Sequence, residues 1–443
     1  MTLEDVTAGK AAVSKGGYVR RVVAASLVGT TIEWYDFFVY GTAATLIFNK
    51  LFFPQSDPLV GTMLALTTYA IGFVARPAGG LIFGHFGDRL GRKRLLMLSL
   101  VLMGGSTVLI GALPTYNSIG LAAPILLVLL RIIQGVAIGG EWGGAVLLVA
   151  EHSKPRHRGF WASWPQIGAP LGNMLATGVL AVMVALLSDE AFIAWGWRVP
   201  FLLSSVLLVI GYYIRMSITE SAVFQEERRK LEESRTKPAQ APVAELFTRY
   251  RRQLLIAIGS YFVINVLYYI MTAFTLVYLD HVGIGKGKAL SALLIASALE
   301  SAAVPLFGHL SDRYGRKPVY LLGAVGTLLF AFALFPLLGS GSFVLITFAL
   351  IIGLLLHGLM YGPQAAFFAE LFPTRIRYSG SSLGVQITTI FAGSLAPIIG
   401  TWLLTTFNSW VPIAGYIALC AAVTSVTLLF APETRNRDLT KIQ

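Results

Sequence analysis

Two acidic residues, Glu33 and Asp36, lie three positions apart inside an apolar stretch that spans residues 22–48. On a helix this spacing places both carboxylates on one face. An ionisable side chain inside a bilayer costs on the order of 3 kcal/mol, so each is a functional candidate. Burial and mutual repulsion both favour the protonated acids. The pair therefore has the chemistry of a group that loads and releases a proton near neutral pH.

Two arginines, Arg76 and Arg131, also fall inside apolar stretches. A buried guanidinium can hold an anionic group of a ligand, or it can pair permanently with Glu33 or Asp36. The two interpretations can hold together, because ion-pair partners can exchange between conformations. We predict Arg76 as a substrate contact and Arg131 as a member of the proton-coupling group.

The stretch around Arg131 carries a polar stripe. Gln134 and Glu141 lie within about 80° of Arg131 around a helix, so the stripe is predicted to line a water-accessible cavity. Glu141 joins the predicted proton-coupling group. On an adjacent face, Gly135 and Gly139 begin a glycine repeat every four residues. Such ridges let helix backbones approach closely, and we assign them to packing.

Polar and aromatic side chains recur at helical spacing in other apolar stretches. Aromatic rows serve packing more often than ligand binding, but interspersed Asn, Gln and His leave the two roles about equally open. Glu300 is an alternative proton site, and His357 either titrates near neutral pH or stays neutral and hydrogen-bonded. The candidate substrate contacts, besides Arg76, are Tyr35, Gln134, Gln166, Asn173, Tyr261, Asn265, Tyr268, His357, Tyr361, Gln364 and Gln386.

The elements that must position these residues are membrane-spanning helices. Hydrophobic residues make up 56% of the 443-residue chain and charged residues 13%, with a mean hydropathy of +0.71. A water-soluble fold cannot bury that much apolar surface, so we expect an all-α integral membrane protein. A span needs about 20 apolar residues. The sequence predicts twelve spans, at 22–48, 60–83, 95–113, 121–150, 160–187, 198–216, 253–279, 289–307, 319–338, 343–369, 379–405 and 410–431.

A charged segment at 84–94 recurs at 308–318, which indicates two copies of one unit. We predict six-helix halves at 1–216 and 253–443, joined by a cytoplasmic linker at 217–252. Acid–arginine pairs seven residues apart recur as well, at positions where they can hold one side of the molecule shut. A purely topological role for the arginines is the alternative. The predicted gating residues are Asp88, Arg89, Arg92, Glu151, Arg158, Asp312, Arg316, Glu370 and Arg377.

Most of the 34 Lys and Arg residues lie in alternate connectors, which places both termini in the cytoplasm. The net charge of +12 thus serves membrane topology rather than nucleic-acid binding. The first twenty residues lack an apolar run, so no cleavable signal peptide is expected. The sequence contains no P-loop, no metal-ligand cluster and no nucleophile–base pair, and Cys420 is its single cysteine. We expect no cofactor, no metal and no enzymatic activity.

The spans and the repeated charged segment resemble the major facilitator superfamily over nearly the whole chain. Narrower motifs resemble the metabolite:proton symporters, a branch with carriers for shikimate, α-ketoglutarate, citrate, and proline or betaine. The resemblance implies proton symport by alternating access across a bacterial inner membrane. Osmosensing proline/betaine carriers typically extend into a C-terminal coiled coil, whereas this sequence ends at Gln443, which disfavours an osmosensor. The segments that carry the narrower resemblance are 33–37, 76–80, 134–141 and 370–374.

Together these features predict a symporter that imports protons with a small organic solute, most simply a carboxylate such as shikimate or a di- or tricarboxylate. The two halves are expected to rock around a midplane site, within a monomer. An osmolyte symporter of the proline/betaine type is the alternative. A nutrient receptor that signals without net transport is a further one, which the short linker disfavours.

Overall fold

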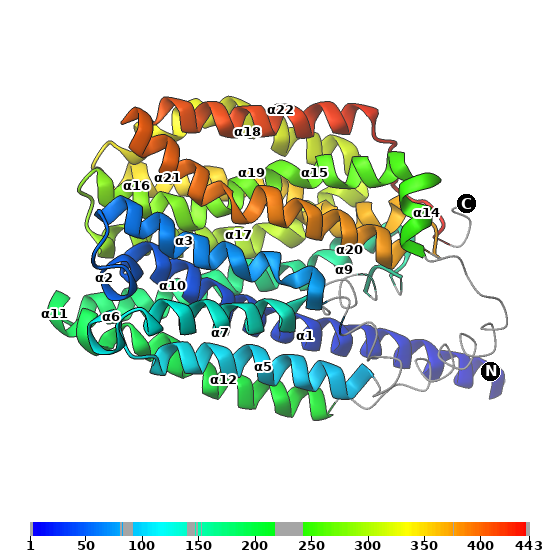
Figure 1. Ribbon diagram of the computed structural model, residues 1–443. Coiled ribbons are helices and arrows are strands. Elements are labelled where there is room, and N and C mark those ends of the chain that lie inside the picture. The colour runs from blue at the N-terminus through cyan, green and yellow to red at the C-terminus, as the bar shows by residue number, and fades with distance from the viewer. Residues whose placement is uncertain are drawn as a thin grey trace.

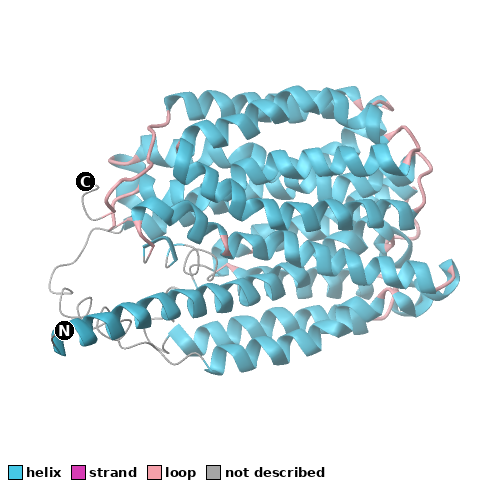
Figure 2. Cartoon of the chain, turned by 180° about the vertical axis from the view of Figure 1, so that it is seen from behind, coloured by secondary structure: helices cyan, strands magenta, loops and turns pink. Residues whose placement is uncertain are grey.

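The computed structural model describes residues 3–79, 82, 92–139, 147, 149–151, 153–217, 242–374 and 376–439. These residues form helices joined by short connectors, and no strand occurs among them (Figure 2). The predicted all-α class is confirmed.

The first half supplies six long helical segments. The first helix, α1, starts at Leu3 rather than near residue 22, because its polar start contains good helix formers such as Ala, Lys and Glu. Short helices α2 (Phe48–Phe52), α6 (Tyr116–Ile119) and α11 (Asp189–Ala191) lie at the end opposite the termini (Figure 1). The long segments are α1 (Leu3–Leu46), α3 (Pro58–Val74), α5 (Arg92–Ala112), α7 (Ala122–Ile138), α9 and α10 (Arg158–Ser163 and Gly168–Leu186) and α12 (Arg198–Ser217).

The second half repeats the pattern after α14 (Pro242–Thr248), a short helix that falls within the predicted linker. Two of its spans contain π-helical segments, Ile270–Phe274 and Thr389–Ser394. Such segments are rare and often occur at functional sites. The spans are α15 and α16 (Arg251–Tyr269 and Thr275–His281), α17 (Lys286–Tyr314), α18 (Arg316–Leu338), α19 (Phe343–Leu371), α20 and α21 (Arg377–Thr388 and Ala396–Phe407) and α22 (Val411–Phe430).

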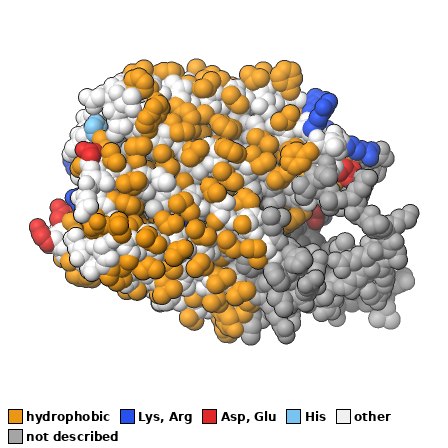
Figure 3. All heavy atoms as spheres, viewed as in Figure 1, with side chains coloured by type: hydrophobic (Ala, Val, Ile, Leu, Met, Phe, Trp, Pro, Cys, Tyr) orange, Lys and Arg blue, Asp and Glu red, His pale blue; other side chains and the backbone are white. Residues whose placement is uncertain are grey.

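Within the described ranges, eight helices are long and apolar enough to cross a membrane, and a bent pair at 189–213 makes a ninth. The long α1 and the shorter apolar α5 and α7 complete the twelve predicted spans. Hydrophobic side chains cover the middle of the visible face, and Lys and Arg gather at the end that holds both termini (Figures 1 and 3). This distribution fits lipid around the middle and cytoplasm at the basic end.

The two halves meet along α10, which packs against α1 in its own half and against α17 in the other. Two amide side chains cross this interface. Asn173 Nδ2 donates to Ser297 Oγ at 2.9 Å, and Gln166 Nε2 donates to the Gln364 side-chain oxygen at 2.6 Å. The interface is therefore partly polar at its core.

Glycines bring α7 against α3, as the spacing predicted. A Cβ at Gly135 would collide with the carbonyl oxygen of Gly72, and one at Gly139 with that of Arg76. The backbone of α7 thus lies directly on α3. This close contact sets where Arg76 and Arg131 can reach.

We expect Gly135→Ala to lower the free energy of unfolding by about 1–3 kcal/mol, because the new methyl group overpacks this contact. Chemical unfolding of the purified protein in detergent measures the change. Gly105→Ala is the matched control, since a Cβ there meets no atom within 4 Å. In a helix interior that change is neutral or stabilises by up to about 1 kcal/mol. Equal stability of the two variants would contradict the packing assignment.

Candidate functional site

Asp36 of α1 is buried, with 1% of its surface exposed. Ser204 Oγ of α12 donates to its carboxylate at 2.5 Å, and the Thr107 side chain of α5 hydrogen-bonds the same group. Thr107 Oγ1 also accepts from Gln134 Nε2 at 2.9 Å. Gln134 in turn accepts a hydrogen bond from Arg131 NH1. A continuous polar chain therefore joins Asp36 of α1 to Arg131 of α7 through Thr107 of α5 and Gln134 of α7.

The Arg131 guanidinium lies among aromatic rings. Its Cζ is 4.2 Å from the ring centroid of Tyr40, 4.6 Å from that of Phe37 and 4.8 Å from that of Tyr69. The Nε and NH2 groups of Arg131 have no hydrogen-bond partner among the described residues. The electron-rich ring faces offset part of the cost of burying the charge. Donors remain available for an anion.

Arg76 of α3 lies in a similar setting. Its Cζ is 4.5 Å from the Phe73 ring centroid, 4.7 Å from Phe37 and 5.9 Å from Trp34. Its Nε likewise finds no partner within the described part of the chain, although the half-buried Glu33 attracts its charge. Phe37 thus lies against both guanidinium groups. Two buried cations share one aromatic wall on the inner side of the first half.

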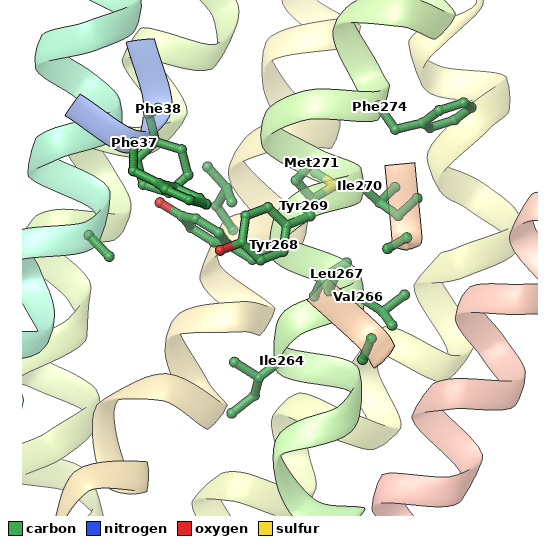
Figure 4. Packing of buried hydrophobic residues seen from close by; sticks show 14 of the residues in the cluster. Phe37, Phe38, Ile264, Val266, Leu267, Tyr268, Tyr269, Ile270, Met271 and Phe274 are labelled. Carbon is green, nitrogen blue, oxygen red and sulfur yellow. The ribbon is translucent and has the colours of Figure 1, made fainter. Parts of the chain in front are cut away.

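A narrow pocket with a free volume of about 20 Å³ lies between the halves, next to this wall. In Figure 4, Phe37 and Phe38 of α1 face Tyr268 and Tyr269 of α15. The Phe38 and Tyr268 ring centroids are 5.6 Å apart. The pocket combines ring faces with one imidazole and one amide. Its lining residues are Trp34, Ala169, Tyr261, Ile264, Asn265, Tyr268, Tyr269, His357 and Tyr361.

At the cytoplasmic end, the buried Glu370 of α19 joins the halves. It accepts from Arg158 NH1 of the first half at 2.8 Å and from Arg316 Nε of the second half at 3.2 Å. Asp312 adds a second link, since it accepts from the backbone N–H groups of Gly159 and Phe160, each at 2.8 Å. Asp312 also pairs with Arg316 at 2.7 Å. We call Arg158, Asp312, Arg316 and Glu370 the cytoplasmic network.

The segment after α22 completes this network. Thr434 Oγ1 donates to Glu370 at 2.8 Å, and the Arg437 carbonyl oxygen accepts from Arg158 at 3.0 Å. Arg377 donates to the carbonyl oxygen of Leu439 at 2.9 Å. These C-terminal contacts were not predicted from the sequence.

Comparison with known proteins identifies the family. The model of the Major Facilitator Superfamily matches residues 26–394 and again 301–442. The chain belongs to the major facilitator superfamily. Its fold is shared by the proton:xylose symporter XylE, whose structure with 6-bromo-6-deoxy-D-glucose matches with a TM-score of 0.73 at 20% identity, covering 96% of this chain and 98% of that one.

Several curated members of the superfamily resemble this one along nearly its full length. The Inner membrane metabolite transport protein YhjE of Escherichia coli (strain K12) is 43% identical, with 95% of each chain covered. The Shikimate transporter of the same organism is 38% identical, over 94% of this chain and 95% of that protein. The Proline/betaine transporter of the same strain is 36% identical, over 99% of this chain and 87% of that protein. The chain is thus a multi-pass protein of the bacterial inner membrane, in a family of transporters.

In this superfamily member, some predicted substrate contacts lie away from the pocket. Tyr35 donates to the Pro200 carbonyl oxygen at 2.7 Å, within the first half. Gln386 is half-buried, and its side-chain oxygen has no hydrogen-bond partner among the residues described. The predicted residues that line the pocket are Tyr261, Asn265, Tyr268, His357 and Tyr361. Those that cross the interface or join the polar chain are Gln166, Asn173, Gln364 and Gln134.

The gating prediction is covered in part by the described residues of this family member. Arg377 pairs with Glu151 across the halves at 2.8 Å, at a carboxylate that is 40% exposed. Glu141, Asp88 and Arg89 lie outside the described residues, as does the side chain of Arg92. No group of three or more His, Cys, Asp or Glu side chains in the described part could hold a metal ion.

Several residues of the site were not predicted from the sequence, among them Thr107, Ser204, Trp34 and Tyr269. Trp34 lies between the two acids of α1, and Tyr269 follows Tyr268 directly, so proximity to predicted residues was the available signal.

Proposed function

We propose that this protein imports a small organic carboxylate together with protons by alternating access. The observation that carries the proposal is the buried chain from Asp36 to Arg131, which places an acid and an unsatisfied cation in one hydrogen-bonded unit. The Shikimate transporter among its relatives supports a cyclic carboxylic acid as solute.

In the proposed cycle, Asp36 receives a proton while the pocket is open to the periplasm. Protonation removes a negative charge from the polar chain, which leaves the positive charge of Arg131 available to an anion. The solute carboxylate then binds near Arg76 and Arg131, with its carbon skeleton against the pocket rings. With these charges compensated, the halves rock, and the cytoplasmic network opens to release solute and proton.

Uptake into proteoliposomes tests the proposal. The panel is labelled shikimate, citrate, a dicarboxylate, an aromatic acid, proline and betaine, each with and without an inward pH gradient. We expect accumulation of a carboxylate only when the gradient is present. Equal uptake without the gradient would show that transport is not coupled to protons. Absence of uptake for every solute would favour a receptor.

A zwitterionic osmolyte is the second candidate, and the pocket itself favours it. Five of the lining residues are aromatic, and ring faces bind quaternary ammonium groups by cation–π attraction. The Proline/betaine transporter among the relatives adds support. Betaine uptake that rises under hyperosmotic conditions would select this candidate.

We expect Arg76→Gln to raise the KM for the carboxylate roughly tenfold to hundredfold, because a charge-assisted hydrogen bond contributes about 1.5–3 kcal/mol. The measurement is initial uptake against solute concentration, with the uncharged amide of the same solute as a competitor. The amide should compete equally well in both proteins. Arg249→Gln, at an exposed arginine, is the control. An unchanged KM in Arg76→Gln would show that Arg76 does not bind the substrate.

A further inference from the structure

The second half contains a buried acid–imidazole pair that the proposed cycle does not use. Glu300 of α17 and His357 of α19 bond through Oε1 and Nδ1. Their side chains are 0% and 3% exposed. The other carboxylate oxygen of Glu300, Oε2, has no hydrogen-bond partner among the described residues. The pair therefore retains one vacant acceptor in an apolar interior.

The pair also reaches the pocket. The His357 ring lies 4.6 Å from the Tyr268 ring centroid and 4.9 Å from that of Tyr361, and all three residues line the cavity. The titratable groups that face Glu300 from the described elements are His357 and the hydroxyls of Tyr268 and Tyr361. Of these three pocket residues, His357 is the one that the described part of the structure shows hydrogen-bonded to Glu300.

Counting protons shows what the pair can do. With one proton, the pair is neutral overall, whether the proton lies on Glu300 Oε1 or on His357 Nδ1. A second proton is accommodated on Oε2, which gives a carboxylic acid beside an imidazolium and a net charge of +1. Burial of an isolated positive charge is unfavourable. A solute carboxylate beside the His357 ring compensates it, so proton and anion favour each other's binding reciprocally.

We propose that Glu300 and His357 form a second proton site, which takes up its proton together with the solute carboxylate. This inference rests on the proposed carboxylate symport. Each half then holds one proton site: Asp36 in the first and the Glu300–His357 pair in the second. Both protons come from the periplasmic side and leave with the solute to the cytoplasm, and no bond other than those to the protons is made or broken.

Infrared difference spectroscopy tests the site by acidification alone, because without a solute the second proton should still bind at lower pH, and a bound solute carboxylate should raise that midpoint. Acidification of the purified protein should change carboxylic-acid carbonyl absorption at two sites. Glu300→Gln should remove one change and leave the other, and Asp36→Asn should do the reverse. His357→Gln should retain the Glu300 signal at a shifted midpoint. The control Asp280→Asn, at an exposed acid on α16, should leave both of these changes in place. A Glu300→Gln spectrum identical to that of the wild type overturns the proposal.

Transport separates this inference from the proposed function. At zero membrane potential and a pH gradient of one unit, two coupled protons support about hundredfold accumulation of shikimate, citrate or another transported panel solute, and one proton about tenfold. We expect Glu300→Gln to show that tenfold drop and to keep solute exchange at equal pH. A purely structural role would impair exchange as well. If no panel solute responds to pH in the wild type, the proposed function fails, and the infrared result still decides the proton site.

Discussion

Replacing Asp36 by asparagine is expected to lower pH-driven solute accumulation at least tenfold while exchange of internal for external solute continues. Asparagine fits the same space and can still accept from Ser204, but it cannot bind and release a proton. Each proton lost from the cycle removes a factor of ten at a gradient of one pH unit. Accumulation ratios and counterflow in the same proteoliposomes provide the two measurements.

Asp57→Asn is the matched control for this change. Asp57 caps α3 by accepting from the Leu59 N–H at 3.0 Å, a role that asparagine fills equally well. It should transport like the wild type. Ser204→Ala should give an intermediate result, because it removes a hydrogen bond of Asp36 and keeps the acid. Wild-type accumulation by Asp36→Asn would exclude Asp36 from coupling.

Apolar length and charge placement were sufficient to predict the helices, because a bilayer admits few alternatives to them. The hydrogen-bonded path from Asp36 to Arg131 was harder to predict. One of the two interpretations of the sequence paired an acid directly with Arg76 or Arg131, whereas Thr107 and Gln134 lie between Asp36 and Arg131 in the structure. The single hydroxyl proton of Thr107 can go either to Asp36 or to the Met103 carbonyl oxygen of its own helix at 3.0 Å, a bond that threonines in apolar helices commonly make. Its second role depends on tertiary packing, which periodicity cannot report.

The pocket residues were also predicted only in part, because helical spacing does not report tertiary packing. A stripe at i, i+4 and i+7 selected Tyr261, Asn265 and Tyr268, all of which line it. Tyr269 lies about 100° further around an ideal helix, yet it lines the pocket too. The helix changes to π geometry at Ile270, immediately afterwards. The spacing of hydrophobic residues does not indicate where a helix changes to π geometry. A prediction from regular helical spacing therefore omits residues next to such a change.

The contacts of the C-terminal segment were not predicted, for a different reason. Residues 431–439 are polar and short, and their composition resembles that of any cytoplasmic tail. Two of the contacts use backbone carbonyl oxygens, at Arg437 and Leu439, which side-chain patterns do not reveal. The acid–arginine repeat did single out Glu370 and Arg158, which lie together in the structure.

Replacing Glu370 by alanine is expected to shift the protein toward a conformation that is open to the cytoplasm, by a factor on the order of 100 or more. The change leaves Arg158 and Arg316 buried, close together and without their shared carboxylate. Removal of one partner from a buried ion pair costs about 3–5 kcal/mol, and here the cost falls on the closed state alone. Opening of the cytoplasmic side exposes both guanidinium groups to water, which removes the free-energy cost of burying them.

Spin labels on the two halves measure this shift. Lys154→Cys and Tyr314→Cys, at exposed positions, supply the labelling sites after Cys420→Ser removes the buried native thiol. Glu370→Ala should move the label distances to longer values, and pH-driven accumulation should fall because the cytoplasmic side no longer closes.

Glu151→Gln is the matched control, because it removes an acid from the other pair between the halves, at a carboxylate that is 40% exposed. The Glu151 carboxylate is partly solvated, and the buried Arg377 keeps its bonds to the Phe372 and Leu439 carbonyl oxygens, so the label distances should change far less than in Glu370→Ala. The contrast tests burial rather than charge alone, since both variants remove one carboxylate from an arginine at the same face. Equal shifts in the two variants would mean that net charge at the cytoplasmic end, and not the buried Glu370, holds the halves together.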